Sequence, residues 1–213
     1  MATTVFTQAS EARAVRPGAI RLSIALALTL WLLLVLALGA KHAFSGRPGA
    51  PPVAIALGVG VPLVVFFAWL RLSRSFREVV LSLDLSFIAG LQAWRWAGLG
   101  FLFLYAYRIL PAMFALPAGL GDMAVGFAAP WMILGLVRQP EFGASKAFIR
   151  WNVLGIADLI LALGLGAASA WFPGKVSAAP MATLPLLVIP AYLVPLFLML
   201  HATALMQGRR SAR

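Results

Sequence analysis

Four charged side chains stand in or beside stretches of sequence that are otherwise apolar. Asp122 lies in PAGLGDMAVGFAAP (117–130), and Asp158 lies in LGIADLILALGLGA (154–167). Arg95 and Arg108 belong to the apolar stretch before them. A charge at the centre of a bilayer costs about 2.5–3.5 kcal/mol on insertion scales, so each of these groups is expected to have a partner or a function.

The composition explains why these positions are expected to lie in a membrane. The chain has 213 residues, of which 62% are hydrophobic and only 11% charged, whereas a soluble domain is about a quarter charged. Several apolar stretches reach the length of about 20 residues that a spanning helix needs. We predict an all-α polytopic membrane protein, a bundle of six transmembrane helices with short loops, over residues 19–40, 53–70, 86–107, 118–137, 151–171 and 182–206.

Two connections are harder to interpret. Pro111 and Pro117 both lack an amide donor and disfavour a continuous helix, so residues 110–117 are expected to separate spans three and four. The segment 71–84 carries three arginines before an apolar run. A solvated basic loop is the favoured interpretation, and an amphipathic helix on the inner leaflet or an early start of span three stays open.

Positive charge predicts the orientation, because cytoplasmic loops carry an excess of Lys and Arg. With both termini inside (N-in/C-in), residues 1–18 form a cytoplasmic tail, 19–206 the six-span domain and 207–213 a basic cytoplasmic tail. The first span is longer than a usual signal-peptide core and is expected to stay uncleaved. Twelve basic residues then lie inside and four outside: Arg13, Arg16, Arg21, Arg71, Arg74, Arg77, Arg138, Lys146, Arg150, Arg209, Arg210 and Arg213, against Lys41, Arg47, Arg108 and Lys175.

The net charge of +11 is therefore assigned to topology and to anionic headgroups at the cytoplasmic face, and no nucleic-acid partner is predicted. The expected location is a membrane, namely the bacterial cytoplasmic (inner) membrane.

Depth along the helices predicts which charges meet. At about 1.5 Å per residue, Arg95 lies about 13 Å and Asp158 about 10 Å from the inner ends of their spans. Asp122 lies only about 6 Å from the outer end of span four, near Arg108. We expect an inner pair of Arg95 and Asp158, an outer pair of Arg108 and Asp122, and a hydrogen bond from Gln92 to the inner pair.

Small residues share the helix face of each aspartate, which allows close helix packing in lipid. They are Gly155, Ala162 and Gly166 around Asp158, and Gly119, Gly126 and Ala129 around Asp122.

Several enzyme and cofactor classes lack support. The chain has no cysteine and no Walker-type loop or HExxH motif. His42 and His201 are expected to be interfacial and on opposite sides of the bilayer, so they cannot share a metal or a haem. The depth estimate also separates Asp122 from Asp158 and disfavours a carboxylate dyad. No cofactor and no metal is predicted, and an enzyme is the least supported class.

Two functions remain. The first is a small proton- or ion-coupled permease for an unidentified small solute. In it, Asp158 carries the proton, Arg95 and Gln92 tune that carboxylate, and Asp122 with Arg108 forms an outer gate or docking point. A cavity reaching Asp158 would favour it. The second is a structural or accessory subunit of a partner membrane complex, whose Arg–Asp pairs only fix helix packing. An apolar groove facing lipid would favour that alternative.

Overall fold

A computed structural model of the chain describes residues 17–46, 50–169, 171 and 176–211. In this part, six helical segments are long and apolar enough to cross a membrane, and no strand is present. The predicted all-α class and the six spans are confirmed. The spans are α2 (Pro17–Ala40), α3 (Val53–Leu72), a third span over Leu85–Ala106, α7 (Ala112–Arg138), α8 (Lys146–Ala168) and a sixth over Ile189–Arg209.

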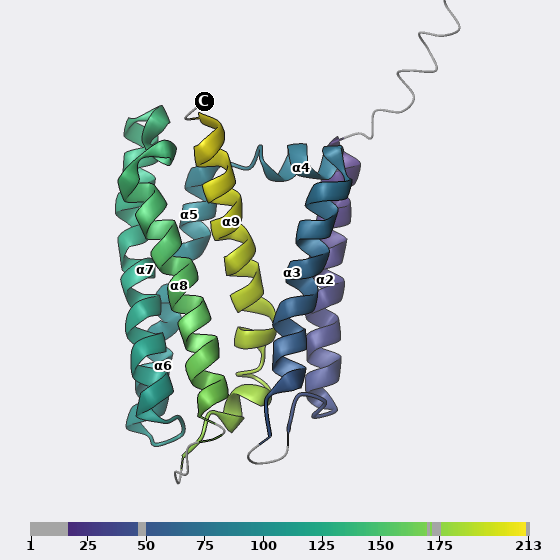
Figure 1. The fold of residues 1–213 in the computed structure, drawn as a ribbon, viewed down its shortest axis with the longest axis vertical. Helices are drawn as coiled ribbons and strands as arrows, with labels where there is room; N and C mark the ends of the chain where they lie inside the picture. Colours follow the sequence, from purple (N-terminus) through teal and green to yellow (C-terminus); the bar gives the residue numbers. More distant parts are fainter. Residues whose placement is uncertain (1–16, 47–49, 170, 172–175, 212–213) are drawn as a thin grey trace, which may run out of the picture.

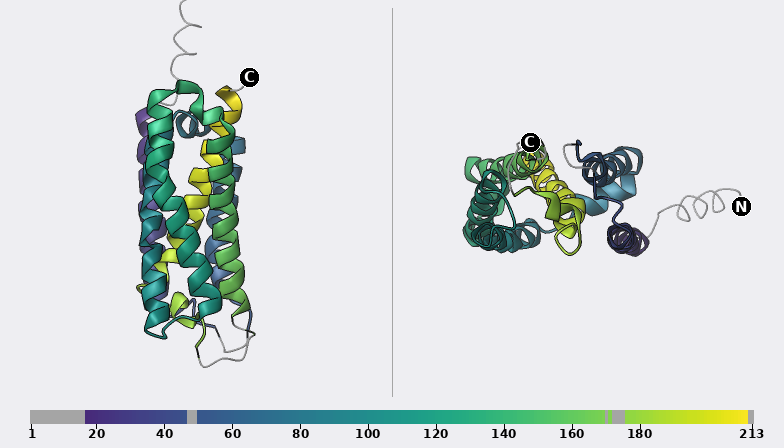
Figure 2. Two further views of the ribbon diagram at one scale, coloured as in Figure 1. Left: turned by 90° about the vertical axis from the view of Figure 1, so that its left-hand side faces the viewer. Right: turned by 90° about the horizontal axis from the view of Figure 1, so that it is seen from below.

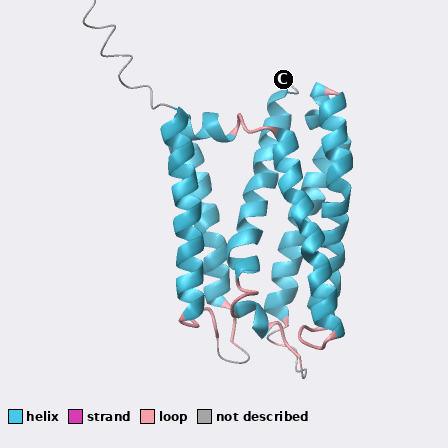
Figure 3. Cartoon of the chain, turned by 180° about the vertical axis from the view of Figure 1, so that it is seen from behind, coloured by secondary structure: helices cyan, strands magenta, loops and turns pink. Residues whose placement is uncertain are grey.

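The third, fourth and fifth spans form one group, and α2 and α3 form a second group to one side (Figures 1 and 2). The sixth span, which ends in α9 (Val194–Ser211), lies between these two groups and packs on both α8 and α3. The start of α2 and the end of α9 lie at the same end of the molecule (Figure 1), as an even number of spans requires. The C-terminal ends of α2, of the third span and of α8 lie at the opposite end of the molecule (Figure 3).

The third span is not a continuous α-helix. It consists of α5 (Leu85–Gln92), the 3₁₀-helix η1 (Ala93–Gly98) and α6 (Leu99–Ala106). A 3₁₀ segment of this length inside a helix is uncommon and often marks strain or a hinge. Arg95 lies on this segment, so the tighter winding sets the direction in which its side chain leaves the backbone.

The third span can approach α7 closely because both carry glycine at the contact. A Cβ atom placed on Gly126 would lie 2.5 Å from the amide nitrogen of Trp96. A Cβ atom on Gly98 or on Gly119 would lie 2.9 Å from the carbonyl oxygen of the other. The two backbones therefore touch, as small-residue seams permit in membranes, and the buried stripe of Gly119, Gly126 and Ala129 agrees with the face expected from the sequence.

The segment after α3 forms a short amphipathic helix, α4 (Arg74–Val80), and not the solvated loop favoured above. Ser73 caps it by accepting a hydrogen bond from the amide of Phe76, 3.2 Å away. Phe76 is buried and stacks on Trp69 with ring centroids 4.1 Å apart, whereas Arg74 is exposed. Burial of its apolar face against α2 and α3 stabilises this helix. The sequence of the segment alone did not show that these neighbours would cover that face.

Three span starts differ from the prediction. Helix α8 begins at Lys146 and not at 151. Helix α7 begins at Ala112 and includes Pro117, so the separating segment is shorter than residues 110–117. The sixth span begins at Ile189 and not at 182, and its first turn, η4 (Ile189–Leu193), is a π-helix that contains Pro190. A proline inside a membrane helix removes only one backbone bond, and local π adjustments accommodate it.

The predicted tails are described only in part. Residues 1–16 and 212–213 lie outside the described residues, and α9 continues through most of the predicted C-terminal tail to Ser211.

The contact between α7 and η1 makes a first prediction. Gly126→Ala places a methyl group against the backbone of Trp96, and we expect the free energy of unfolding to fall by about 1–3 kcal/mol, as overpacking usually does. Thermal unfolding of the purified chain in detergent measures it. The control is Gly100→Ala on α6, in the third span, where no neighbouring atom lies within 4 Å of the added Cβ. A tolerated Gly126→Ala, with stability equal to that of the control, would contradict the close approach.

The orientation stays a prediction that the cysteine-free chain makes easy to test. Ser45 and Ser82 are both exposed and lie at opposite ends of the bundle, after α2 and after α4. We expect a membrane-impermeant maleimide added to intact cells to label Ser45→Cys and to label Ser82→Cys only after permeabilisation. The reverse pattern would place both termini outside.

Candidate functional site

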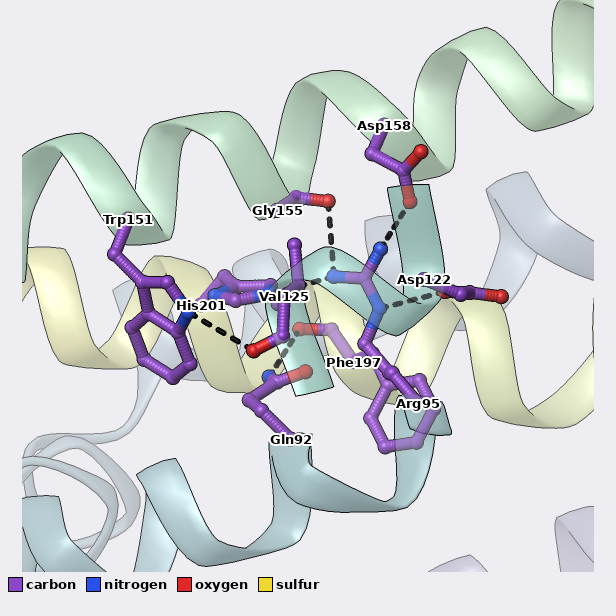
Figure 4. Close-up of polar contacts among 9 residues, drawn as sticks. All are labelled: Gln92, Arg95, Asp122, Val125, Trp151, Gly155, Asp158, Phe197 and His201. Atoms are coloured by element: carbon purple, nitrogen blue, oxygen red, sulfur yellow. Dashed lines mark hydrogen bonds and ion pairs between the residues drawn. The ribbon is translucent and has the colours of Figure 1, made fainter. Parts of the chain in front are cut away.

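Arg95 is the centre of the only ion-pair cluster among the described residues, and its side chain is 0% exposed. Its Nε donates to Oδ1 of Asp122 at 2.7 Å, and its Nη2 donates to Oδ2 of Asp158. Its Nη1 donates to the carbonyl oxygen of Gly155 at 3.2 Å and faces Nε2 of His201 at 3.1 Å (Figure 4). One guanidinium thus connects the third span, α7, α8 and α9.

Small residues on α8 make room for this arrangement. A Cβ atom on Gly155 would overlap the imidazole of His201 and would lie 3.0 Å from Nη1 of Arg95. Gly155 is therefore needed for space, and its carbonyl oxygen accepts a hydrogen bond from the same guanidinium. Gly155, one of the small residues that the sequence predicts on a helix-packing face beside Asp158, thus also forms part of the wall of the charged cluster.

The hydrogen bonds of His201 fix its protonation state. Nη1 of Arg95 can only donate, so Nε2 of His201 accepts. On the other side, Nδ2 of Asn152 donates to the carbonyl oxygen of Phe148 at 2.9 Å. The amide oxygen of Asn152 therefore faces Nδ1 of His201, 2.9 Å away, and accepts its proton. His201 is a neutral imidazole with its proton on Nδ1.

The charges of this group do not balance. We call Arg95, Asp122, Asp158 and His201 the Arg95 cluster. With both carboxylates ionised and His201 neutral, it holds one positive and two negative charges, a net charge of −1. The side chains of Asp122 and Asp158 are only 16% and 13% exposed. A surplus charge so poorly exposed is costly, and a proton or a cation bound there would neutralise it.

The expected contact between Arg95 and Asp158 is present, but the expected pair of Asp122 and Arg108 is not. Asp122 binds Arg95, and Arg108 lies exposed in the turn after α6, with a left-handed φ of 57°. The reason is the start of α7. Because the helix begins at Ala112, Asp122 lies about 15 Å from its end and not 6 Å, level with the middle of the third span.

The same correction brings Asp122 and Asp158 together, although the depth estimate had separated them. Gln92 is buried beside the cluster, but its Nε2 donates to the carbonyl oxygen of Phe197 at 3.3 Å and not to an aspartate. Its Oε1 has no hydrogen-bond partner among the described residues.

Sequence reasoning missed His201 and Asn152. His201 was expected at the interface, yet it is 0% exposed and touches both Arg95 and Asn152. Asn152 is equally buried. A polar residue inside each of spans five and six was the available signal, since polar groups in membrane helices usually face the bundle interior.

A cleft of about 750 Å³ lies between α3 and α8 and reaches the cluster at Asp122. We call it the α3–α8 cleft. Residues within 177–183 and the first turns of the sixth span, at Ile189, Pro190 and Val194, also line it. Asp122 is its only charged residue among the described ones that line it. Asp158 does not line it, so the cavity reaches a different carboxylate from the one expected.

The charge imbalance predicts how substitutions change stability. Asp122→Asn or Asp158→Asn leaves one carboxylate for one guanidinium, and we expect the melting temperature in detergent to stay equal or rise. Arg95→Gln leaves two carboxylates without a cation, and the double Asn variant leaves the guanidinium without an anion. Each of these should lose about 3–5 kcal/mol, as buried charges without partners do.

Thermal unfolding of the four variants checks this order. If each single Asn variant lost as much stability as Arg95→Gln, both carboxylates would be structural partners of the arginine, and neither would be surplus.

Comparison with known proteins assigns a family but no activity. No curated protein and no solved structure matches the chain. The family described as "Domain of unknown function (DUF8737)" matches residues 52–207, which run from the start of α3 into α9 and include every residue of the Arg95 cluster. Because the match covers well over half of its length, the chain belongs to this family.

Proposed function

We propose that this membrane protein is a small permease that couples the movement of a solute to the binding of a proton at the Arg95 cluster. One observation carries the proposal: two carboxylates from different helices share one buried guanidinium, and one of them, Asp122, lines the α3–α8 cleft.

Helix packing alone does not call for this arrangement. One carboxylate neutralises one guanidinium, and a second adds the cost of a further charge in a region of low polarity, about 2.5–3.5 kcal/mol on insertion scales. Ionisable groups retained inside a membrane commonly belong to ion pathways and proton relays. The surplus carboxylate is therefore interpreted as a group that exchanges a proton or a cation.

A change of charge in the Arg95 cluster can be transmitted to the helices that hold it. A proton on Asp122 removes its charge and weakens its bond to Arg95, so that the guanidinium is held mainly by Asp158. Arg95 lies on η1, which has less favourable hydrogen-bond geometry than an α-helix. A change at Asp122 thus acts on the segment where the third span and α7 touch. Solute and proton then compete for the same carboxylate in the cleft.

The proposal also includes the orientation of the chain in the membrane and the identity of that membrane. With both termini in the cytoplasm of a bacterial cell, the α3–α8 cleft belongs to the outer half of the protein, and the basic ends face the anionic headgroups of the inner leaflet.

A second candidate, an accessory subunit of a membrane complex, has one observation in its favour. Trp94 and Trp96 on η1 are 75% and 52% exposed near the middle of the bundle. Neither indole N–H donates a hydrogen bond among the described residues, whereas indoles usually lie at membrane interfaces. A helix of a partner subunit packed over Gly90 and Ala97 would cover them.

Proton flux in proteoliposomes tests the permease. The full chain is reconstituted into vesicles that have an acidic interior and a trapped pH indicator. Five classes of solute are then added outside in turn: inorganic cations, neutral sugars, zwitterions, organic cations and organic anions. We expect one class to change the internal pH in native vesicles but not in empty ones. Asp122→Asn should abolish this response, and Leu57→Phe, a change at an exposed side chain of α3, should retain it.

If the folded protein gave no change of internal pH with any solute class, the permease proposal would be wrong. A response that is unchanged in Asp122→Asn would remove the Arg95 cluster from the mechanism.

A further inference from the structure

We infer that the α3–α8 cleft binds an organic cation with an apolar body, with the positive centre beside Asp122. The inference names the solute class for the permease proposed above and rests on that proposal for its role in transport. Binding itself is argued below from the lining of the cleft.

The first step concerns charge. Asp122 is the only charged residue among the described residues of the cleft wall. Its Oδ1 accepts the hydrogen bond from Arg95, and its Oδ2 points away from the guanidinium (Figure 4) and has no hydrogen-bond partner in the described part of the chain. With both carboxylates ionised, the Arg95 cluster, which includes Asp122 itself, has a net charge of −1. An anionic or neutral solute gains nothing from such a wall, whereas a cation supplies the missing positive charge.

The second step concerns the size of the charged group. A bare metal ion such as Ca²⁺ or Mg²⁺ requires about six or more oxygen ligands. The cleft offers one carboxylate, and its hydroxyl groups are largely engaged. Ser169 donates to the carbonyl oxygen of Gly166 at 2.7 Å and accepts from the amide of Ala178 at 3.2 Å. Thr183 donates to the carbonyl oxygen of Pro180 at 3.0 Å. These walls therefore suit neither a small inorganic ion nor a sugar.

The third step concerns the apolar body. Phe44, Phe101 and Phe114 line the cleft together with aliphatic residues of α3 and α8. Phe101 and Phe114 meet edge to face with centroids 5.5 Å apart. Aromatic faces attract organic cations, and quaternary ammonium groups are recognised in this way. The volume of about 750 Å³ lies within the range of pockets for drug-sized ligands.

Two probes of the same shape and opposite charge test the inference directly. Tetraphenylphosphonium and tetraphenylborate are titrated into the purified full chain in detergent, and bound probe is measured by equilibrium dialysis against protein-free micelles. We expect saturable binding of one tetraphenylphosphonium per chain and no saturable binding of tetraphenylborate. Asp122→Asn should bind tetraphenylphosphonium about tenfold more weakly or worse, as loss of a charge-assisted contact predicts.

A matched pair of variants tests the place of binding. Ala56 is exposed and lines the cleft, whereas its neighbour Leu57 is exposed and does not. Ala56→Phe should weaken binding severalfold, and Leu57→Phe should leave it unchanged. Thermal unfolding of Ala56→Phe, Leu57→Phe and Asp122→Asn checks that each variant remains folded. If Ala56→Phe unfolds, the smaller Ala56→Leu replaces it.

The outcomes separate this inference from the proposed function. Equal binding of both probes, or equal binding of the cation by the native chain and Asp122→Asn, overturns the cation site. If the proteoliposomes respond to another solute class in an Asp122-dependent way and tetraphenylphosphonium does not bind, the permease stands and the solute class is wrong. If the cation binds at Asp122 but drives no proton flux, the cation site is confirmed and the permease proposal is wrong.

Discussion

The structure depends on one buried guanidinium that has to be satisfied from several helices at once. Arg95 is 0% exposed in its side chain and lies in the middle of an apolar span, where no solvent is available to its donors. Its partners come from α7, α8 and α9. Because a guanidinium is planar and rigid, these partners must lie at set directions around it. The relative heights and rotations of four spans are thereby coupled.

Glycines make the coupling geometrically possible. Gly126 and Gly119 allow α7 to touch the third span at η1, and Gly155 leaves room for the imidazole of His201 beside Arg95. The backbones are in close contact at these glycines, and the α3–α8 cleft reaches the cluster at Asp122. A tightly packed interior next to an open carboxylate differs from a purely structural ion pair, which would be closed on all sides.

The surplus carboxylate relates the fold to its proposed use. Charge in a membrane interior is stable only when it is compensated, and here compensation is incomplete by one unit. His201 cannot supply it, since its hydrogen bonds to Arg95 and Asn152 hold it neutral. In the proposed function, the balancing positive charge comes from outside the chain, as a proton or as a cation that enters the cleft. Both the proposed coupling and the inferred solute class follow from this single deficit.

From the amino-acid sequence alone one could predict the all-α class, the six apolar spans, the glycine stripes beside both aspartates and the contact between Arg95 and Asp158. These follow from composition, length and local spacing, which act along one helix. The three-dimensional packing was needed to show that Asp122 joins the same arginine, that His201 belongs to the cluster and is held by Asn152, and that a cleft reaches Asp122. These depend on where helices begin and how far they slide past each other. A shift of six residues at the start of α7 moves Asp122 by about 9 Å. Proline signals predict such a boundary only loosely, because packing against neighbouring spans can keep Pro117 inside the helix.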